Sequence, residues 1–523
     1  MLADVCVYGG TAAGVVAAIT AARLKRSVIL VEPSRHLGGM TTGGLGFTDS
    51  GNKAAIGGIS RDFYRQIGKH YGKDEQWTFE PHVAEQILNQ WIAESGVKVL
   101  MEHRLAEVDK EAGRIHRVML EHVPADPSNA PGHAENIQEH VQIDAAMFID
   151  ATYEGDLMAG AKVSYTVGRE AVAKYNEDLN GVRPLTPKHQ FLVPVDPYIK
   201  PGNPASGLLP LILPGDGGKP GEGDARVQAY NFRLCLSRNP QNRTPIGPPQ
   251  GYDARTFEVL GRHLENLKAA NKPVNLGMLL KIDRMPNDKT DINNNGAVST
   301  DHLGESWKYP DGSYDARRQI WLKHLTYTHG LLHFLATDPR VPEEVRKDRG
   351  QWGFCNDEFT DTAGWPHQIY VREARRMVAD YVITQAVCRH EQQVDDSIGL
   401  ASYNMDSHNV QRVVQNGVAR NEGDVQVAPS GPYPISYRAI VPRKPECENL
   451  LVPVCLSASH IAYGSVRMEP VFMLIGQSSA IAAHMAIEKK SSVQDVDVKM
   501  LQQRLLEGGQ VLRWEGKKPA ANH

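Results

Sequence analysis

The sequence lacks several features that would assign it to a class at once. Its six cysteines among 523 residues include no C-x-x-C pair, which argues against a dithiol redox centre or a structural zinc site. No apolar run approaches the roughly 20 residues that span a bilayer. The net charge of −4 comes with no basic stripe, so we expect no nucleic-acid partner. No leader precedes the first expected strand, which favours the cytoplasm; a trimmed leader would leave the periplasm or secretion open.

What the sequence does contain is a strand–turn–helix–strand pattern at its start. The turn is Gly9–Gly14, and the second strand ends at Glu32. Gly9 permits the tight turn, Gly14 lets the helix approach the sheet, and the helix N-terminus offers N–H groups to a pyrophosphate. Glu32 stands where a carboxylate accepts a hydrogen bond from a ribose hydroxyl group. Thr11 replaces the middle glycine of G-x-G-x-x-G and is expected to crowd the phosphate slightly, but the pattern still predicts a dinucleotide site.

A second glycine-dense segment follows directly, over residues 35–46. Glycine backbone can pass close to a phosphate or a flat ring and can take positive φ. A flexible surface loop is the alternative, but Met40, Leu45 and Phe47 place much apolar area within the segment, which exposed loops rarely carry. The segment therefore favours FAD over NAD.

The rest of the chain predicts two or three domains. Residues 1–170 and 435–523 are expected to form one dinucleotide-binding domain from both chain ends, with residues 171–434 as an inserted α+β substrate or cap domain. Apolar spacing predicts helices at 80–95, 320–335, 369–390 and 471–488, and strands at 97–101, 146–152 and 449–455. The polar tract 121–140 is interpreted as a surface loop or hairpin tip.

The C-terminal part carries the clearest mechanistic hint. Pro470 suits the first turn of the predicted helix. The partial positive charge of that helix N-terminus, aimed at the N1–C2=O edge of a flavin, would stabilise the reduced ring, and Arg467 would add to the same field. Gly476 lies on a small face of the helix that can pack closely on a neighbour. An ordinary core helix with a surface arginine is the alternative.

Together these segments resemble the FAD-dependent oxidoreductase family related to succinate dehydrogenase and fumarate reductase flavoproteins. The chain is more closely similar to bacterial members loosely labelled "xanthan lyase", a name that does not fit a flavin-binding chain. The resemblance covers the full length and implies FAD on a glutathione-reductase-like domain of α/β Rossmann type. The candidate cofactor-binding residues are Gly9, Gly10, Thr11, Ala13, Gly14, Glu32, Pro33, Gly38, Gly39, Met40, Thr41, Thr42, Ala151, Thr152 and Gly476.

Three residues are candidates for catalysis: His408, His460 and Arg467. Hydride removal from a carbinol carbon needs a base for the hydroxyl proton, and a histidine near neutral pKa suits that task. His408 is a base that a nearby carboxylate could orient, and His460 competes because it precedes the predicted flavin-facing helix. A hydrogen-bonded structural role is the alternative for each. Arg372 and Arg376 would share one face of the predicted 369–390 helix and bind a carboxylate or form salt bridges.

The sequence thus predicts a FAD-dependent enzyme that dehydrogenates a polar, sugar-like small molecule by hydride transfer to flavin N5. The sugar-like character is inferred from polar and aromatic residues of the inserted segment: Asn293–Asn295, Trp307, Trp365, Tyr403 and His408. The alternatives are a fumarate-reductase-like reduction of an unsaturated acid and a flavin-binding protein without turnover. No second G-x-G-x-x-G follows a strand, so the electron acceptor is expected to be oxygen, a quinone or a partner protein. No metal site is predicted, because Asp291–Gly296 opens like a calcium loop but lacks its final glutamate. A homo-oligomer stays open.

Overall fold

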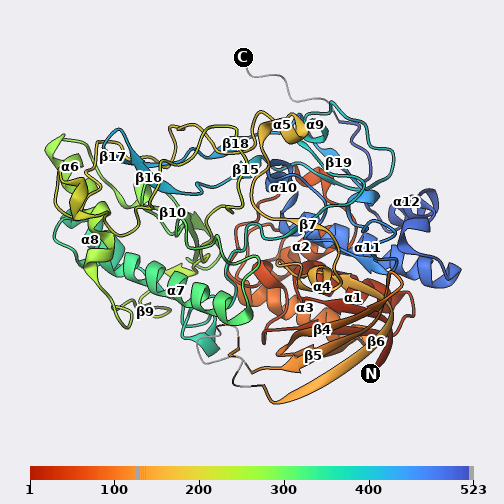
Figure 1. The fold of residues 1–523 in the computed structure, drawn as a ribbon. Coiled ribbons are helices and arrows are strands. Elements are labelled where there is room, and N and C mark those ends of the chain that lie inside the picture. Colours follow the sequence, from red (N-terminus) through yellow and green to blue (C-terminus); the bar gives the residue numbers. More distant parts are fainter. Residues whose placement is uncertain (125–129, 131, 134, 136, 517–523) are drawn as a thin grey trace. The chain divides into compact units, whose positions relative to one another are not determined.

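The structure is a computed structural model that describes residues 1–124, 130, 132, 133, 135 and 137–516. The predicted loop at 121–140 lies partly outside these residues. The chain divides into two compact units. Figure 1 shows its helices and strands coloured along the sequence. Unit 1 comprises Met1–Val167, Glu373–Asp406 and Gln426–His523, and unit 2 comprises Gly168–Arg372 and Ser407–Val425.

Unit 1 is built on a sheet with the strand order β3-β2-β1-β6-β5-β4, in which β20 also pairs with β6. Strands β3, β2, β1 and β6 run parallel, as do β6 and β20, whereas β4, β5 and the first half of β6 are antiparallel. Tyr8 is in register with Val31 of β2 and Asp150 of β6, so the carboxyl ends of these three strands share one edge. The strands are β1 Leu2–Tyr8, β2 Val28–Glu32, β3 Lys98–Met101, β4 His103–Glu111, β5 Arg114–His122, β6 Glu139–Asp150 and β20 Leu450–Leu451.

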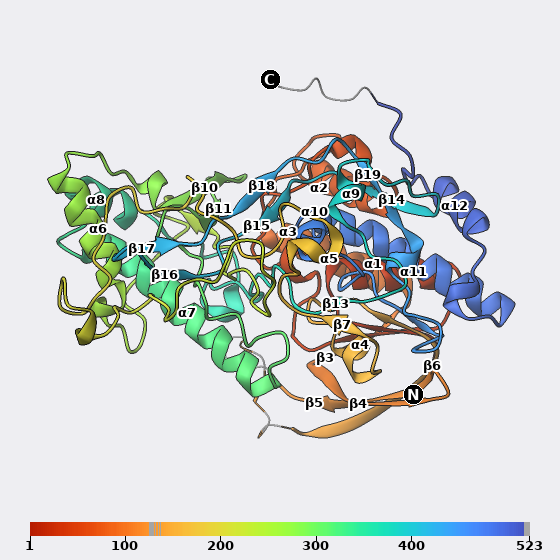
Figure 2. The same cartoon turned by 45° about the horizontal axis from the view of Figure 1, so that its top comes forward.

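The long strand β6 takes part in both the antiparallel and the parallel part of the unit 1 sheet. Its first half belongs to the antiparallel β4-β5-β6 ribbon, seen as long curved strands in Figure 2. Its second half lies between β1 and β20, where Phe148 is in register with both Cys6 and Leu450. Residues from the start and the end of the sequence therefore pair with the same strand.

Helices α1 (Ala12–Arg23) and α11 (Glu469–Lys489) pack against each other in unit 1 (Figures 1 and 2). The contact is close because both helices carry small side chains: a Cβ atom on Gly476 would lie 2.3 Å from the carbonyl oxygen of Ala13. Together with the β6–β20 pairing, this packing confirms the prediction that both ends of the chain build one α/β domain.

Helix α11 is long and apolar enough, by length and composition, to cross a membrane, which was not expected from the sequence. Of its apolar window, 94% is buried inside the protein, as in a core helix. Its first turn contains Pro470, whose missing N–H costs nothing there. The remaining helices of unit 1 are α2 Gly58–His70, α3 Pro81–Ser95, α4 Asp156–Gly160, α9 Gln385–Cys388, α10 His460–Val466 and α12 Val498–Glu507.

Short elements complete unit 1. The pairs β7–β13 and β14–β19 are antiparallel ribbons. Their bounds are β7 Tyr165–Thr166, β13 Arg376–Met377, β14 Ser397–Ala401 and β19 Tyr433–Ser436. The 3₁₀ turns are η1 Gly39–Thr41, η2 Lys53–Ala55, η8 Tyr437–Ala439 and η9 Val493–Asp495. Strands β15 Met405–Ser407 and β18 Val425–Val427 contain points where the chain passes between the units.

Unit 2 consists of long loops around a few regular elements. Its longest helix, α7 (Tyr314–Thr337), begins after Ser313, whose side chain accepts a hydrogen bond from the Ala316 N–H. Its strands are β8 Leu236–Ser237, β9 Thr244–Pro245, β10 Leu280–Arg284, β11 Thr290–Asn294, β12 Gly353–Phe354, β16 Arg412–Gln415 and β17 Val418–Asn421. Its other helices are α5 Val172–Tyr175, α6 Glu258–Ala269 and α8 Glu343–Gly350, with 3₁₀ turns η4 Pro204–Ser206, η5 Ala254–Phe257, η6 Leu276–Met278 and η7 Thr360–Thr362.

Most predicted elements are confirmed, and one is wrong. The helices predicted at 80–95, 320–335 and 471–488 correspond to α3, α7 and α11. The predicted helix at 369–390 does not form: this stretch contains only the two-residue strand β13 and the short helix α9. Tertiary contacts override its helical pattern, because Glu373, Arg375 and Arg376 are buried and each is joined to a charged partner.

Candidate functional site

The turn that follows β1 has the geometry expected of a dinucleotide-binding turn. A Cβ atom on Gly9 would lie 2.7 Å from the backbone nitrogen of Thr152, and one on Gly14 only 1.9 Å from the carbonyl oxygen of Gly9. Side chains are therefore excluded at both positions. The other N–H groups of the first turn of α1 have no intrahelical acceptor and suit an anion.

Thr11 explains the departure from the glycine pattern. It is the N-cap of α1, where its hydroxyl oxygen accepts a hydrogen bond from the Gly14 N–H at 3.3 Å. The same hydroxyl group donates to the carbonyl oxygen of Ala151 at 2.7 Å, just beyond the end of β6. Thr11 thus fastens the turn to the neighbouring strand, a role that glycine could not fill.

Glu32, at the end of β2, lies next to this turn. Its Oε2 accepts the Gly10 N–H at 2.7 Å and its Oε1 accepts the Ser34 N–H at 2.7 Å. Burial raises the pKa of Glu32, against the effect of these N–H donors. A carboxylate has about four acceptor positions, so the group can still accept a ribose hydroxyl.

The second glycine segment joins the first. The Gly38 N–H donates to the carbonyl oxygen of Gly10 at 2.7 Å, and Thr42 Oγ1 donates to the carbonyl oxygen of Leu37 at 2.6 Å. Pro33, Ala151 and Thr152 follow the carboxyl ends of β2 and β6, the edge at which open parallel sheets bind ligands. Apart from Gly476, the candidate cofactor-binding residues therefore gather at one edge of the unit 1 sheet. Gly476 packs against Ala13 of α1.

Two residues at this edge were missed from the sequence: Glu469 and Tyr153. Glu469, at the start of α11, accepts a hydrogen bond from Thr41 Oγ1 at 2.7 Å and one from the Tyr153 hydroxyl group at 2.7 Å. The Tyr153 oxygen in turn accepts the Met40 N–H at 2.9 Å. No local signal marks these contacts, because more than 300 residues separate Glu469 from Tyr153.

His460, a predicted catalytic residue, is buried at the start of α10. Its Nδ1 lies 2.7 Å from Glu373 Oε2, and Arg376 Nη1 donates to the same carboxylate oxygen at 3.1 Å. The side chains of Glu373 and Arg376 are fully buried and that of His460 is 2% exposed. The segment that contains His460 forms the short helix α10.

Arg467 lies between α10 and α11. Its Nη2 donates to Asp406 Oδ2 at 2.9 Å, and its side chain is 2% exposed. The carboxylate of Asp406 compensates its positive charge. Its proximity to a flavin ring stays a prediction.

His408, the third catalytic candidate, belongs to unit 2. Its Nδ1 lies 2.7 Å from Asp301 Oδ2, while Arg372 Nη1 donates to Asp301 Oδ1 at 2.8 Å. Burial raises the pKa of Asp301, but the charges of Arg372 and His408 outweigh that effect and hold it below its ordinary value. Asp301 is therefore an ionised carboxylate at neutral pH, and the His408 side chain remains 14% exposed.

Amide side chains of unit 2 hold the backbone of His408 and the residue before Asp301. Gln228 Oε1 accepts the His408 N–H at 3.1 Å. Asn231, which is fully buried, donates to Asn293 Oδ1 at 3.1 Å and to Thr300 Oγ1 at 3.2 Å. The imidazole ring is thus held at Nδ1 by a carboxylate, and its side chain keeps 14% exposure.

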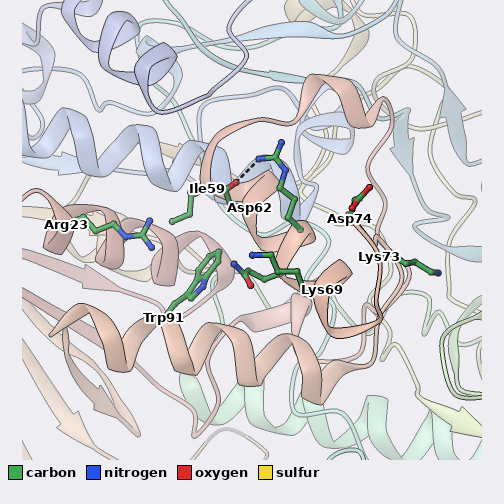
Figure 3. A pocket seen from close by; sticks show the side chains of 9 residues that line it. Arg23, Ile59, Asp62, Lys69, Lys73, Asp74 and Trp91 are labelled. Carbon is green, nitrogen blue, oxygen red and sulfur yellow. Dashed lines mark hydrogen bonds and ion pairs between the residues drawn. The ribbon is translucent and has the colours of Figure 1, made fainter.

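A separate hollow in unit 1 has different chemistry. This cavity of about 360 Å³ lies between α1, α2 and α3, and Figure 3 shows Arg23, Lys69 and Trp91 around it. Asp62 and Arg65, which also line it, form an ion pair with their charged atoms 2.9 Å apart. Within the described part of the chain, none of the candidate cofactor-binding residues lines this cavity.

A family model described as FAD dependent oxidoreductase matches residues 4–505. The chain belongs to this family. Membership of this family assigns FAD as its cofactor. The Cβ-free turn at Gly9, the acid at Glu32 and the N–H groups of α1 are chemically suited to hold that group.

Solved flavoenzyme structures share only distant similarity with the chain. A flavin-dependent brominase, Bmp2, is 13% identical over 36% of this chain and 48% of its own, with a TM-score of 0.24. A 3-ketosteroid-Δ4-(5α)-dehydrogenase from Rhodococcus jostii RHA1 is 15% identical over 30% of this chain and 48% of its own, with a TM-score of 0.20. The chain thus spans about half the length of each. No curated protein matches the sequence.

Proposed function

We propose that this oxidoreductase dehydrogenates a polar, hydroxylated small molecule of sugar-like character, with His408 as the base that takes the hydroxyl proton. FAD supplies the hydride acceptor. The observation that carries the proposal is the Asp301–His408 contact at 2.7 Å, because a carboxylate on Nδ1 orients the ring and stabilises its protonated form after proton transfer. Arg372 keeps Asp301 ionised for this role.

His460 is the weaker candidate for the base. It has the same kind of carboxylate partner, but its side chain is 2% exposed and that of Glu373 is fully buried. A base must reach the proton that it abstracts. We therefore assign His460 a structural role in holding the start of α10.

The reduction of an unsaturated dicarboxylic acid receives less support. A clamp for two carboxylates needs arginines whose charge is available to the substrate. Arg372 is paired with Asp301, Arg376 with Glu373 and Arg467 with Asp406. Each guanidinium charge is already compensated within the protein.

Not all residues behind the sugar-like prediction support it. Asn295 Nδ2 donates to the carbonyl oxygen of Gly277 at 2.5 Å, and Trp365 is 5% exposed, so both serve packing within unit 2. Trp307 donates to the carbonyl oxygen of Val410 at 3.2 Å. The proposal rests on the chemistry of a hydroxyl group rather than on a sugar-stacking surface.

The test is anaerobic bleaching of the enzyme-bound flavin by a panel of sugars, polyols and organic acids. We expect at least one hydroxylated compound to bleach the flavin, and His408→Gln to slow that bleaching while FAD stays bound. A panel in which no hydroxylated compound reduces the flavin, while an unsaturated dicarboxylate reoxidises the photoreduced enzyme, would reverse the assignment. Exposed His116→Gln on β5 is the matched control.

A further inference from the structure

Glu469 is a buried acid at the junction between the C-terminal helix and the second glycine segment. It is 6% exposed and stands at the start of α11. Its two carboxylate oxygens reach different segments: Oε2 accepts from Thr41 in η1, and Oε1 accepts from Tyr153 after β6. A single side chain from the end of the sequence thus connects two segments of the candidate cofactor edge.

The number of protons that each group can donate determines the directions of these hydrogen bonds. The oxygen of Tyr153 accepts the Met40 N–H, so its single proton is the one that points to Glu469. The Thr41 hydroxyl group also donates its proton to Glu469. An ionised carboxylate, which only accepts, satisfies both donors, whereas a protonated carboxyl group would bring a third proton into the same space.

We propose that Glu469 is the positioning residue through which α11 holds the Gly38–Thr42 turn in its FAD-binding shape, and that the ionised carboxylate is the form that does so. Met40 and Thr41 lie in that turn, and both are restrained through this acid, one through Tyr153 and the other directly. The inference does not depend on the identity of the substrate or on His408.

The electrostatic surroundings make this role dependent on pH. Burial raises the pKa of Glu469 to about 7, although the hydrogen bonds from Thr41 and Tyr153 lower it. The positive end of the α11 dipole also favours the ionised form. Besides Tyr153, the acid acts on Tyr64 of α2, whose own pKa is raised by burial and by the charge of Glu469, so Tyr64 keeps its proton. Glu469 therefore changes charge near neutral pH.

The expected size of the effect follows from the fraction of ionised acid. With a pKa of about 7, about a tenth of the molecules are ionised at pH 6 and most are ionised at pH 8. If the ionised form is the one that binds FAD well, the apparent dissociation constant rises about tenfold from pH 8 to pH 6.

The experiment is a titration of apoprotein with FAD, followed by quenching of flavin fluorescence between pH 6 and pH 8.5. We expect the wild-type dissociation constant to rise about tenfold toward pH 6. Glu469→Gln should bind FAD more weakly at pH 8 and show a flat pH profile. Glu488→Gln, the same change at the exposed end of the same helix, should behave like the wild type.

Thr41→Val supplies an independent readout, including for the case in which Glu469→Gln does not fold. The change removes one donor to the ionised acid, so the pH midpoint of FAD binding should move upward. Wild-type affinity and pH profile in Glu469→Gln would overturn the proposal. The proposal would also be overturned if FAD binding by Glu469→Gln still depended on pH. It would be overturned as well if the pH midpoint of FAD binding in Thr41→Val were the same as in the wild type. Failure of every substrate to bleach the flavin would leave these binding results unaffected.

Discussion

Each of the two units contains a histidine joined to a carboxylate that is joined to an arginine. In unit 1 these are His460, Glu373 and Arg376, and in unit 2 they are His408, Asp301 and Arg372. The ion pairs are alike in chemistry and in distance. The difference is access: the histidine side chain is 2% exposed in unit 1 and 14% exposed in unit 2.

This difference indicates that a histidine paired with a carboxylate is not by itself evidence of a catalytic role. A buried network with satisfied hydrogen bonds specifies one packing arrangement. A general base must reach the proton that it abstracts, and a partly exposed imidazole can do so where a buried one cannot. Changes in the unit 1 network should therefore alter stability, and changes in the unit 2 network should alter rate.

The largest expected effect is on the rate, from His408→Gln. Loss of a positioned general base lowers the rate of flavin reduction by roughly 10²–10⁴-fold. The unfolding midpoint should change little, because the ring is partly exposed. Stopped-flow measurement of flavin bleaching under anaerobic conditions, beside urea unfolding, checks both points. An unchanged rate of flavin reduction in His408→Gln would contradict the assignment of His408 as the base.

The next effect is on stability, from Glu373→Gln. The change leaves Arg376 as a buried charge without its carboxylate, which costs about 3–5 kcal/mol. Urea unfolding followed by circular dichroism measures this loss. The folded fraction should still reduce its flavin at close to the wild-type rate. If Glu373→Gln were stable but reduced its flavin much more slowly, the catalytic histidine would be the one in unit 1 instead.

The third effect is the pH dependence of stability, which has opposite signs for the buried acids Glu469 and Asp301. The pKa of Glu469 is raised from 4.5 to about 7, so the folded state binds more protons than the unfolded state between these values, and stability falls as pH rises through this range. At about 1.4 kcal/mol for each pKa unit, the ionised acid costs about 3 kcal/mol. The pKa of Asp301 is lowered, so its contribution is present at neutral pH and is lost on acidification below about 4.

Glu469→Gln tests that sign directly. The stability of the variant relative to the wild type should grow from pH 5 to pH 8, in urea unfolding measured at each pH. Asp301→Asn should show the reverse trend, with its deficit largest at neutral pH and shrinking toward pH 3. Parallel curves for the two variants would contradict the assignment of these charges.

The smallest effect is expected from an exposed ion pair with similar chemistry. Glu343 and Lys347 of α8 lie 2.6 Å apart with side chains 66% and 72% exposed. Glu343→Gln should leave the unfolding midpoint and the rate unchanged, because solvent screens such pairs. A clear loss of stability would show that the loss of an ion pair destabilises this protein even where its charges are exposed.

The sequence predicted the parts of the fold that depend on short-range pattern. The Gly9–Gly14 turn, Glu32 and the helix after Pro470 each contain their own local signal, and each is present in the structure. The helix predicted at 369–390 is not formed in the structure. Arg375 and Arg376 are instead fixed by Asp156 and Glu373, in ion pairs that a pattern of apolar residues does not encode.

The candidate site was less predictable for the same reason. His408 was a candidate, but its carboxylate partner Asp301 lies 107 residues away. Glu469 was overlooked because Thr41, its partner, is 428 residues away. Spacing along a chain identifies contacts within a turn or a helix, and it carries no information on pairs formed when distant segments meet.

The pairing of β20 with β6 and the packing of α11 on α1 have a consequence for biosynthesis. The first βαβ segment emerges from the ribosome hundreds of residues before Leu450–Leu451 and Glu469–Lys489 are made. Contacts of such long sequence separation are slow to form. Loading with flavin should therefore follow release of the polypeptide, and nascent chains stalled before residue 450 should not retain the coenzyme.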